Sequence, residues 1–241
     1  MKLVRALAIG LAGLLWANGS VLAQSVPSGK APATVTVPSV IPIFPLEVAM
    51  LFPGVSRPLH IFEPRYRAMV SAALKGDRII GMTTLKPGYE DNYQGRPPIY
   101  EIGCAGVITE VEELSGGRYN IVLRGIVRFR VTGEDETQPY RLARIEQLPE
   151  VLDDEDKAAL RKQRLRLEEL ITKGSDSKVP PDTSDEELVN MVAQYLPMGL
   201  AERQALLELK TVLLRVKALI ELIESKGVRP RLAAFVRQLP Y

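Results

Sequence analysis

The sequence predicts an α+β protein in which a β-rich N-terminal half precedes a small C-terminal helical bundle. Between residues 40 and 149, short apolar stretches follow the two-residue period of strands and are separated by Pro and Gly. Beyond Pro149, apolar residues recur at three- and four-residue steps, the period of amphipathic helices. With 241 residues, 46% of them hydrophobic and 25% charged, the chain has enough apolar material for a sizeable core.

The first residues have the features of a secretory signal peptide. "MKLVR" is a short basic start, Ala6 to Ala17 form an apolar segment, and small residues precede a cleavage site before Gln24. The apolar segment is shorter than the roughly 20 residues that cross a bilayer. We therefore expect residues 1–23 to be removed and the rest to be exported, periplasmic or extracellular, without a membrane span. Residues 24–38, small and Pro-containing, are expected to form a flexible tether.

About six strands and one or two short helices are expected in the β-rich half, residues 39–149. "VIPIF" and "RPLHIF" are typical of edge strands, because proline gives no donor to a central ladder. Pro64 begins a helix that runs to Gly76, and "RIIGMTTL" is again a strand. Alternating stretches at 99–113 and 118–133 flank "SGG" and predict a hairpin, and "YRLARIEQL" adds the last strand.

Four helices are expected in residues 150–241. "DDEDKAALRKQRLRLEELITKG" places leucines on one face, and Ser184 with Glu187 forms a capping box before the second helix. "AERQALLEL" and "VLLRVKALIELIES" are the other two helices, and Gly227 follows the last one. Short connections between them predict a bundle.

Charge and cysteine content argue against several function classes. Without Lys2 and Arg5 of the leader, basic and acidic residues are equal in number, so nothing global points to nucleic acid. One histidine, one cysteine and no ligand spacing predict no metal site, and no cofactor is expected. Cys104 has no partner for an internal disulfide, and its neighbours "EIGCAGVI" are typical of a buried strand.

The stretch "IPIFPLEVAMLFPGVSRPLHIFEPRYR", residues 41–67, closely resembles the start of the N-terminal, substrate-binding domain of Lon proteases. The similarity continues through "KGDRIIGMTTL", "EIGCAGVITEVEELSGGRYNIVLRGIVRFRV" and "LVNMVAQYLPMGLAERQALLELKTVLLRVKALIELI", and spans about residues 40–225. The resemblance implies a PUA-like pseudo-barrel of the Lon N-terminal type. It also implies a module that helps the full protease to engage unfolded polypeptide. No G-x-x-x-x-G-K-[ST] motif for an ATPase occurs, and no Ser–Lys peptidase domain is expected, so we predict a stand-alone, non-catalytic domain.

The only histidine, His60, lies three residues before Glu63. A Cys–His hydrolase with Cys104 as nucleophile is the enzymatic interpretation. Alternation in "PLHIF" instead places His60 on the face opposite its apolar neighbours, and "FPG" and "EPRYR" are turn and helix-start motifs. We therefore interpret the stretch as scaffolding and predict no catalytic residue.

The loop at 86–98 is the predicted polypeptide-binding site, because it carries residue types that are enriched at interfaces. The predicted binding residues are Met82, Tyr89, Tyr93, Arg96 and Tyr100. An unpaired edge strand that captures an extended peptide is a second route to binding. The alternative is a solvent loop whose aromatic side chains simply pack over the sheet edge.

These observations predict a non-enzymatic domain that binds unfolded polypeptide or a partner protein in the cell envelope. Three alternatives remain open at this level: an adaptor that delivers clients to a separate protease, a Cys–His hydrolase, and a small-molecule or glycan binder. The sequence does not identify the client, the oligomeric state or the role of the tether.

Overall fold

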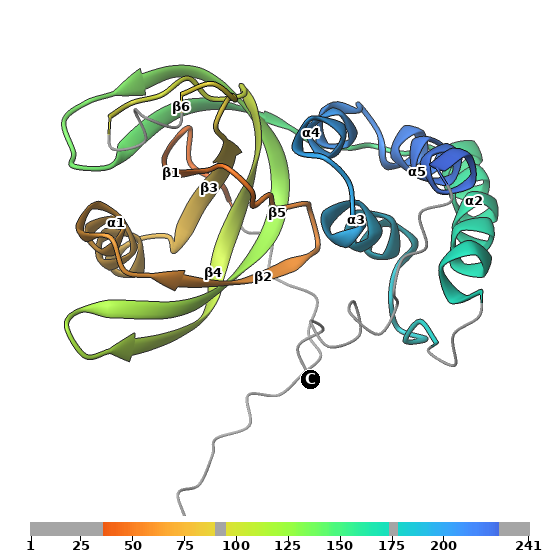
Figure 1. Ribbon diagram of the computed structural model, residues 1–241, viewed down its shortest axis with the longest axis horizontal. Coiled ribbons are helices and arrows are strands. Elements are labelled where there is room, and N and C mark those ends of the chain that lie inside the picture. The colour runs from red at the N-terminus through yellow and green to blue at the C-terminus, as the bar shows by residue number, and fades with distance from the viewer. Residues whose placement is uncertain (1–35, 90–94, 174–177, 227–241) are drawn as a thin grey trace, which may run out of the picture. The chain divides into compact units, whose positions relative to one another are not determined.

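The computed structural model describes residues 36–89, 95–173 and 178–226, and the expected leader at 1–23 lies outside these ranges. The strands and helices are β1 (Val40–Leu46), β2 (Ser56–Ile61), α1 (Pro64–Lys75), β3 (Ile79–Thr84), β4 (Ile102–Leu114), β5 (Arg118–Asp135), β6 (Arg141–Leu148), α2 (Asp154–Thr172), α3 (Asp185–Tyr195), α4 (Leu200–Glu208) and α5 (Val212–Lys226). Strands come first and a group of helices second, which confirms the predicted α+β class (Figure 1).

The six strands form one sheet that closes on itself. Its order is β2-β5-β4-β3-β1-β6, and β6 also pairs with β5, so that five strands make a ring and β2 is attached outside it. Strand β5 is long enough to pair with β2 and β6 at different positions along its length: residues 119–124 pair with β2, and residues 128–135 pair with β6. Register shifts in the β4–β5 and β5–β6 pairs increase the local bend that closure requires. This ring is the predicted pseudo-barrel.

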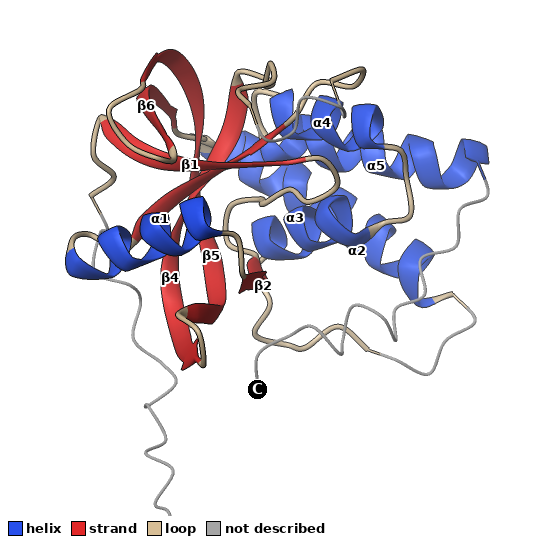
Figure 2. Cartoon of the chain, turned by 60° about the vertical axis from the view of Figure 1, so that its left-hand side comes forward, coloured by secondary structure: helices blue, strands red, loops and turns tan. Residues whose placement is uncertain are grey.

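Helix α1 packs on the sheet as its sequence pattern predicts (Figure 2). Its buried residues Tyr66, Met69, Val70 and Ala73 recur at helical spacing, and Pro64 occupies the first turn, where a missing N–H costs nothing. These side chains form one core cluster with buried residues of β1, β3, β4 and β5. Strand β3 is buried along its whole length, because alternate residues pack on each face of the sheet.

Packed structure begins slightly before the expected boundary of the β-rich half. Val37, which the sequence places in the tether, is buried, and its carbonyl oxygen accepts a hydrogen bond from Gln147 Nε2 at 2.8 Å. The Val37 side chain joins the core cluster that contains Ile41 and Ile145. Val37 therefore packs with the β-rich half, because its apolar side chain has a place in that core.

The loop between β1 and β2 joins the strands to the helices. Met50, Phe52 and Val55 belong to the core cluster of the helical bundle rather than to either cluster of the sheet. Phe52 N donates to Gln194 Oε1 at 3.0 Å, and Tyr195 Oη donates to the Ser56 carbonyl at 2.8 Å. The stretch "LFPGVS" is thus explained by packing and backbone hydrogen bonds.

A backbone crossing fixes this loop against β5. Gly125 N donates to the Val55 carbonyl at 2.9 Å, and Gly54 N donates to the Gly125 carbonyl at 3.0 Å. A Cβ on Gly125 would lie 2.1 Å from the Phe52 carbonyl oxygen, so only glycine allows the two backbones to approach this closely.

A buried ionic cluster connects β5, the segment before α2, and α5. Arg128 Nε and Arg215 Nη2 donate to the same carboxylate oxygen of Glu150, at 2.7 and 2.9 Å. Arg128 also donates to the Leu207 carbonyl at 3.0 Å, and Arg215 to Asn190 Oδ1 at 2.7 Å. Burial lowers the pKa of the Arg215 guanidinium, and the nearby Glu150 carboxylate opposes that shift. The buried charges are therefore paired and hydrogen-bonded.

Helices α2 and α3 begin after residues whose side chains cap them, and Ser184 is the one of these that the sequence predicts. Asp153 Oδ1 accepts from Asp156 N at 2.7 Å before α2, and Ser184 Oγ accepts from Glu187 N at 3.1 Å before α3. Buried apolar residues of α2, α3, α4 and α5 form one cluster. None of the helices within the described ranges has the length and apolar character that crossing a bilayer requires.

Candidate functional site

The sheet holds both ends of the predicted binding loop. Leu85 and Ile99 form an antiparallel bridge, Lys86 N donates to the Pro98 carbonyl at 2.9 Å, and Tyr100 N donates to the Thr84 carbonyl at 2.8 Å. The loop therefore leaves and re-enters the sheet at one point directly after β3. A loop held in this way presents its side chains from a rigid base.

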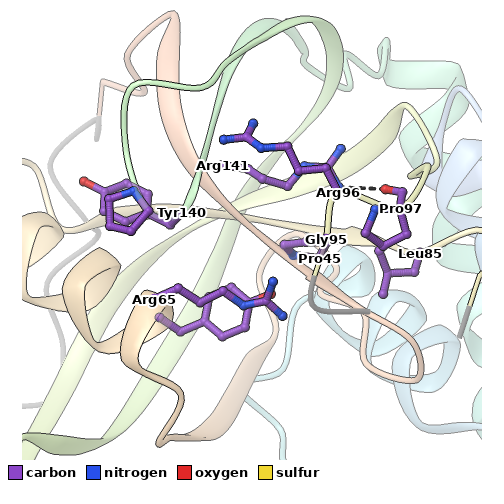
Figure 3. A pocket seen from close by; sticks show the side chains of 10 residues that line it. Pro45, Arg65, Leu85, Gly95, Arg96, Pro97, Tyr140 and Arg141 are labelled. Atoms are coloured by element: carbon purple, nitrogen blue, oxygen red, sulfur yellow. Dashed lines mark hydrogen bonds between the residues drawn. The ribbon is translucent and has the colours of Figure 1, made fainter. Parts of the chain in front are cut away.

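A pocket of about 260 Å³ opens beside this loop (Figure 3). It is lined by residues from five separate segments: Pro45, Arg65, Tyr66, Leu85, Gly95, Arg96, Pro97, Pro139, Tyr140 and Arg141. Proline, tyrosine and leucine supply apolar walls. Figure 3 shows Arg65 on one side of the pocket and Arg96 and Arg141 on the opposite side.

Arg141, the first residue of β6, holds the loop in place. Its Nε and Nη2 donate to the two carboxylate oxygens of Glu134 at 2.7 and 2.5 Å, and its Nη1 donates to the Pro97 carbonyl at 2.8 Å. A guanidinium that binds a carboxylate with two parallel bonds has a defined orientation. Arg141 thus positions the second half of the loop relative to β5 and β6.

Arg65, in the first turn of α1, is held against an aromatic ring. Its guanidinium carbon lies 4.6 Å from the centre of the Tyr66 ring, and its Nη2 lies 3.1 Å from Glu63 Oε2. The Tyr66 ring in turn packs on Phe44 with ring centres 4.4 Å apart. These contacts fix one wall of the pocket, because each ring restricts the next.

Arg96 is the arginine of the pocket with the weakest contacts. Its Nη1 lies 3.4 Å from the Asp135 carbonyl oxygen and 3.7 Å from Glu136 Oε1. The Glu136 side chain is 77% exposed, so water screens this ion pair. Arg96 is therefore the guanidinium that is most easily turned toward a ligand.

The structure brings some of the predicted binding residues together and not others. Arg96 lines the pocket, while Tyr89 is 46% exposed and lines an adjoining hollow. Leu85 lines both spaces, so they share a wall. Met82 is buried because β3 has no exposed face, and its side chain is therefore not part of the surface.

Tyr100 lines neither the pocket nor the adjoining hollow. Tyr100 is half-buried at the base of the loop. Tyr93 lies outside the described residues. The assignment of binding to the set as a whole stays a prediction.

Arg65, Tyr140 and Arg141 were not predicted from the sequence as site residues. They come from the start of α1 and from the turn into β6, far along the chain from the loop at 86–98. No local pattern marks them, because the packing of α1 on the sheet and the pairing of β6 with β5 place these segments beside the loop.

His60 and Cys104, the pair considered for hydrolysis, have separate structural surroundings. Cys104 is fully buried, and burial raises the pKa of its thiol to about 12. His60 is exposed on β2, and its Nδ1 donates to Asn120 Oδ1, with 2.8 Å between the two atoms. Asn120 Nδ2 donates to Glu112 Oε2 at 2.7 Å, so His60 is part of a polar row across β2, β5 and β4. This arrangement favours a structural role for Cys104, since an activated cysteine needs a lowered pKa and access.

The other potential sites are weaker. Over the described ranges, no three His, Cys, Asp or Glu side chains are grouped in a way that would hold a metal ion. In the same ranges β2 pairs along one edge only, with β5, which leaves its other edge for the strand addition considered from the sequence. Pro58 in the middle of β2 gives no N–H donor, so that edge is a poorer template than the pocket.

Comparisons with known proteins agree with this architecture. Lon protease 2 of Myxococcus xanthus is 25% identical over 217 residues, which cover 85% of this chain and 26% of that protein. Lon protease of Anaeromyxobacter dehalogenans is 26% identical over 199 residues, which cover 79% of this chain and 24% of that protein. The chain thus spans about a quarter of the length of these curated relatives.

Two solved structures share the fold. The N-terminal domain of a Mycobacterium avium complex Lon protease superposes with a TM-score of 0.55 at 18% identity, covering 76% of this chain and 96% of that one. A Lon N-terminal domain protein from Xanthomonas campestris superposes with a TM-score of 0.51 at 20% identity, covering 76% and 97%. Residues 40–225 match the family described as the ATP-dependent protease La (Lon) substrate-binding domain, and the chain belongs to that family.

Proposed function

We propose that this chain binds unfolded segments of polypeptide in the cell envelope and that it does so without catalysis. The match over residues 40–225 is to a substrate-binding domain, which supports binding of protein substrates. The observation that carries the proposal is the pocket beside the loop at 86–98, where apolar walls and guanidinium donors meet. An extended peptide offers both partners for such a surface: apolar side chains and unpaired carbonyl oxygens.

The size of the pocket favours single side chains of a polypeptide over a drug-sized ligand at this position. Sites for cofactors and drug-sized molecules occupy roughly 300–1,000 Å³. The pocket has about 260 Å³, and the adjoining hollow at Tyr89 has about 90 Å³. Two small spaces that share Leu85 suit successive side chains of an extended chain better than they suit one compact ligand.

Fluorescence anisotropy of a labelled model protein tests the proposal. A reduced, unfolded form should bind to this protein without nucleotide, and the native form of the same model protein should not. The double variant Tyr89→Ala with Tyr93→Ala should weaken binding, because it removes two aromatic side chains from the loop. Equal anisotropy for unfolded and native forms would contradict general client binding. Unchanged binding by the double variant would contradict a role for the tyrosines.

The proposed location in the cell envelope has its own test. If residues 1–23 are a leader, the intact mass of protein recovered from the periplasm or medium corresponds to a chain beginning at Gln24. Recovery of only the full 241-residue chain in the cytoplasm would overturn the proposed location and leave the binding proposal to its own assay.

A further inference from the structure

Among the described residues, the charged side chains that line the pocket are all of one sign. Arg65, Arg96 and Arg141 line it, and no carboxylate of the described ranges does, although Glu63, Glu134 and Glu136 pair with these arginines. Those acids therefore approach the guanidinium groups from outside the lining. A pocket with three cationic groups on its surface and acids behind them is complementary to an anionic group.

Two of the guanidinium groups retain hydrogen-bonding capacity. A guanidinium carries five N–H donors. Arg141 uses three of them toward described residues, two to Glu134 and one to Pro97. The contacts of Arg96, at 3.4 and 3.7 Å, are at or beyond the limit of a good hydrogen bond. A carboxylate with two oxygens accepts such parallel donors better than a neutral amide does.

The start of α1 contributes little to the potential. Arg65 and Tyr66, in its first turn, line the pocket, and that turn contains no acidic residue, but the N-cap residue is Glu63, whose carboxylate pairs with Arg65. The N-terminus of a helix carries a partial positive charge that favours a nearby anion. This contribution is secondary to the arginines, and it has the same sign.

The remaining walls define what accompanies the anion. Pro45, Leu85, Pro97, Pro139 and Tyr140 give the pocket an apolar and aromatic surface. A single side chain or chain end fits its volume of about 260 Å³, which is below the usual range for larger ligands.

We infer that the pocket selects a carboxylate group of the bound polypeptide next to an apolar residue. This inference rests on the proposed function and specifies its substrate class. The carboxylate comes from an Asp or Glu side chain or from the C-terminus of the polypeptide. Both present the same two-oxygen group to Arg96 and Arg141.

Three short fluorescein-labelled peptides distinguish these sources when titrated with the full chain. The first contains Leu-Asp-Tyr and has an amidated C-terminus, so its carboxylate is internal. The second contains Leu-Asn-Tyr and has a free C-terminus, and the third contains Leu-Asn-Tyr and is amidated. We expect the first or second peptide to bind roughly tenfold tighter than the third, and this ratio to shrink as salt is raised.

Variants of the arginine contacts test whether the pocket is the source of the carboxylate preference. Arg96→Ala should remove most of the tenfold preference, and it should weaken the third peptide by a clearly smaller factor than the other two. Glu136→Gln should increase the preference, because it removes the acid that competes for Arg96. Arg130→Ala is the matched control: Arg130 is an exposed sheet arginine that lies 3.6 Å from Glu146 and does not line the pocket. Circular dichroism checks that each variant is folded.

The outcomes separate the inference from the proposed function. If all three peptides and the unfolded model protein bind equally well, the carboxylate preference is refuted and polypeptide binding stands. If Arg96→Ala weakens all three peptides by the same factor, or Arg130→Ala matches its effect, the pocket is not the selective site. If neither the peptides nor the unfolded protein binds, the proposed function fails and the inference fails with it.

Discussion

Removal of the Glu150 carboxylate should destabilise the protein more than any comparable change on its surface. In Glu150→Gln, the side chain keeps its length and one oxygen but loses its charge. The two guanidinium groups that share it are 0% exposed (Arg215) and 4% exposed (Arg128), so solvent cannot replace the lost anion. Burial already lowers the pKa of Arg215, and Arg128 lowers it further, which shows that the two cations disfavour each other.

The expected loss of unfolding free energy in Glu150→Gln follows from the burial of the ionic cluster. Breaking a buried ion pair by removing one partner costs about 3–5 kcal/mol. The Gln oxygen still accepts a hydrogen bond, so we expect the lower end, about 3 kcal/mol, in the free energy of unfolding. For a chain of this size that corresponds to a fall of roughly 10 °C in Tm. Such a loss is a large part of the about 5–15 kcal/mol that stabilises a typical domain.

Urea unfolding followed by far-ultraviolet circular dichroism measures this loss. Tryptophan fluorescence is unsuitable, because the sole tryptophan lies in the expected leader. Glu146→Gln is the control. Its carboxylate lies 3.6 Å from Arg130, and both side chains are about half exposed, so its removal should cost less than about 1 kcal/mol. If Glu150→Gln and Glu146→Gln unfold at the same urea concentration, the shared Glu150 carboxylate does not stabilise the buried arginines.

Two further experiments test the packing of the sheet: a glycine substitution and the chemical labelling of Cys104. Gly125→Ala should lower the free energy of unfolding by about 2 kcal/mol or more, because the new Cβ would lie 2.1 Å from the Phe52 carbonyl oxygen. Urea unfolding measures this loss. The control is Gly76→Ala, which should be tolerated because its Cβ would have no neighbour closer than 4.0 Å. Equal stability of the two glycine variants would contradict the close crossing. Cys104 should resist iodoacetamide at pH 8 in the folded protein and react in urea, because raising the pKa of the thiol from 9.0 to about 12 reduces the thiolate population about a thousandfold. Mass spectrometry follows the alkylation, and rapid labelling of the native protein would show that the thiol is accessible and would reopen the hydrolase interpretation.

Much of the fold follows from local sequence patterns. The helix from Pro64 to Lys75, with Tyr66, Met69 and Val70 buried, is the one that proline and helical spacing predict. The hairpin of β4 and β5 turns at Gly116 and Gly117, both of which have positive φ, as the "SGG" motif indicates. These features are local, since each depends on residues within one or two turns of the chain.

The candidate site depends on contacts that no local pattern contains. The sequence marks the loop at 86–98 by its composition, and Arg96 does line the pocket. It gives no indication that Arg65 and Arg141 lie across from one another, because their positions depend on α1 packing on the sheet and on β6 pairing with β5. It also does not distinguish Met82 from an exposed methionine, since burial of β3 on both faces is set by neighbours distant in the chain.

The sequence by itself determines the order and type of the elements, the family and the chemical character of the loop. The elements follow from the spacing of apolar, proline and glycine residues, the family follows from the resemblance of residues 40–225 to Lon N-terminal domains, and the character of the loop follows from its composition. Only the tertiary structure decides that the strands close into a ring, that Glu150 pairs with two buried arginines, and that three arginines surround one pocket. The physical reason is that charge pairing and cavity shape depend on distances in space, which are fixed when segments far apart in the sequence pack together.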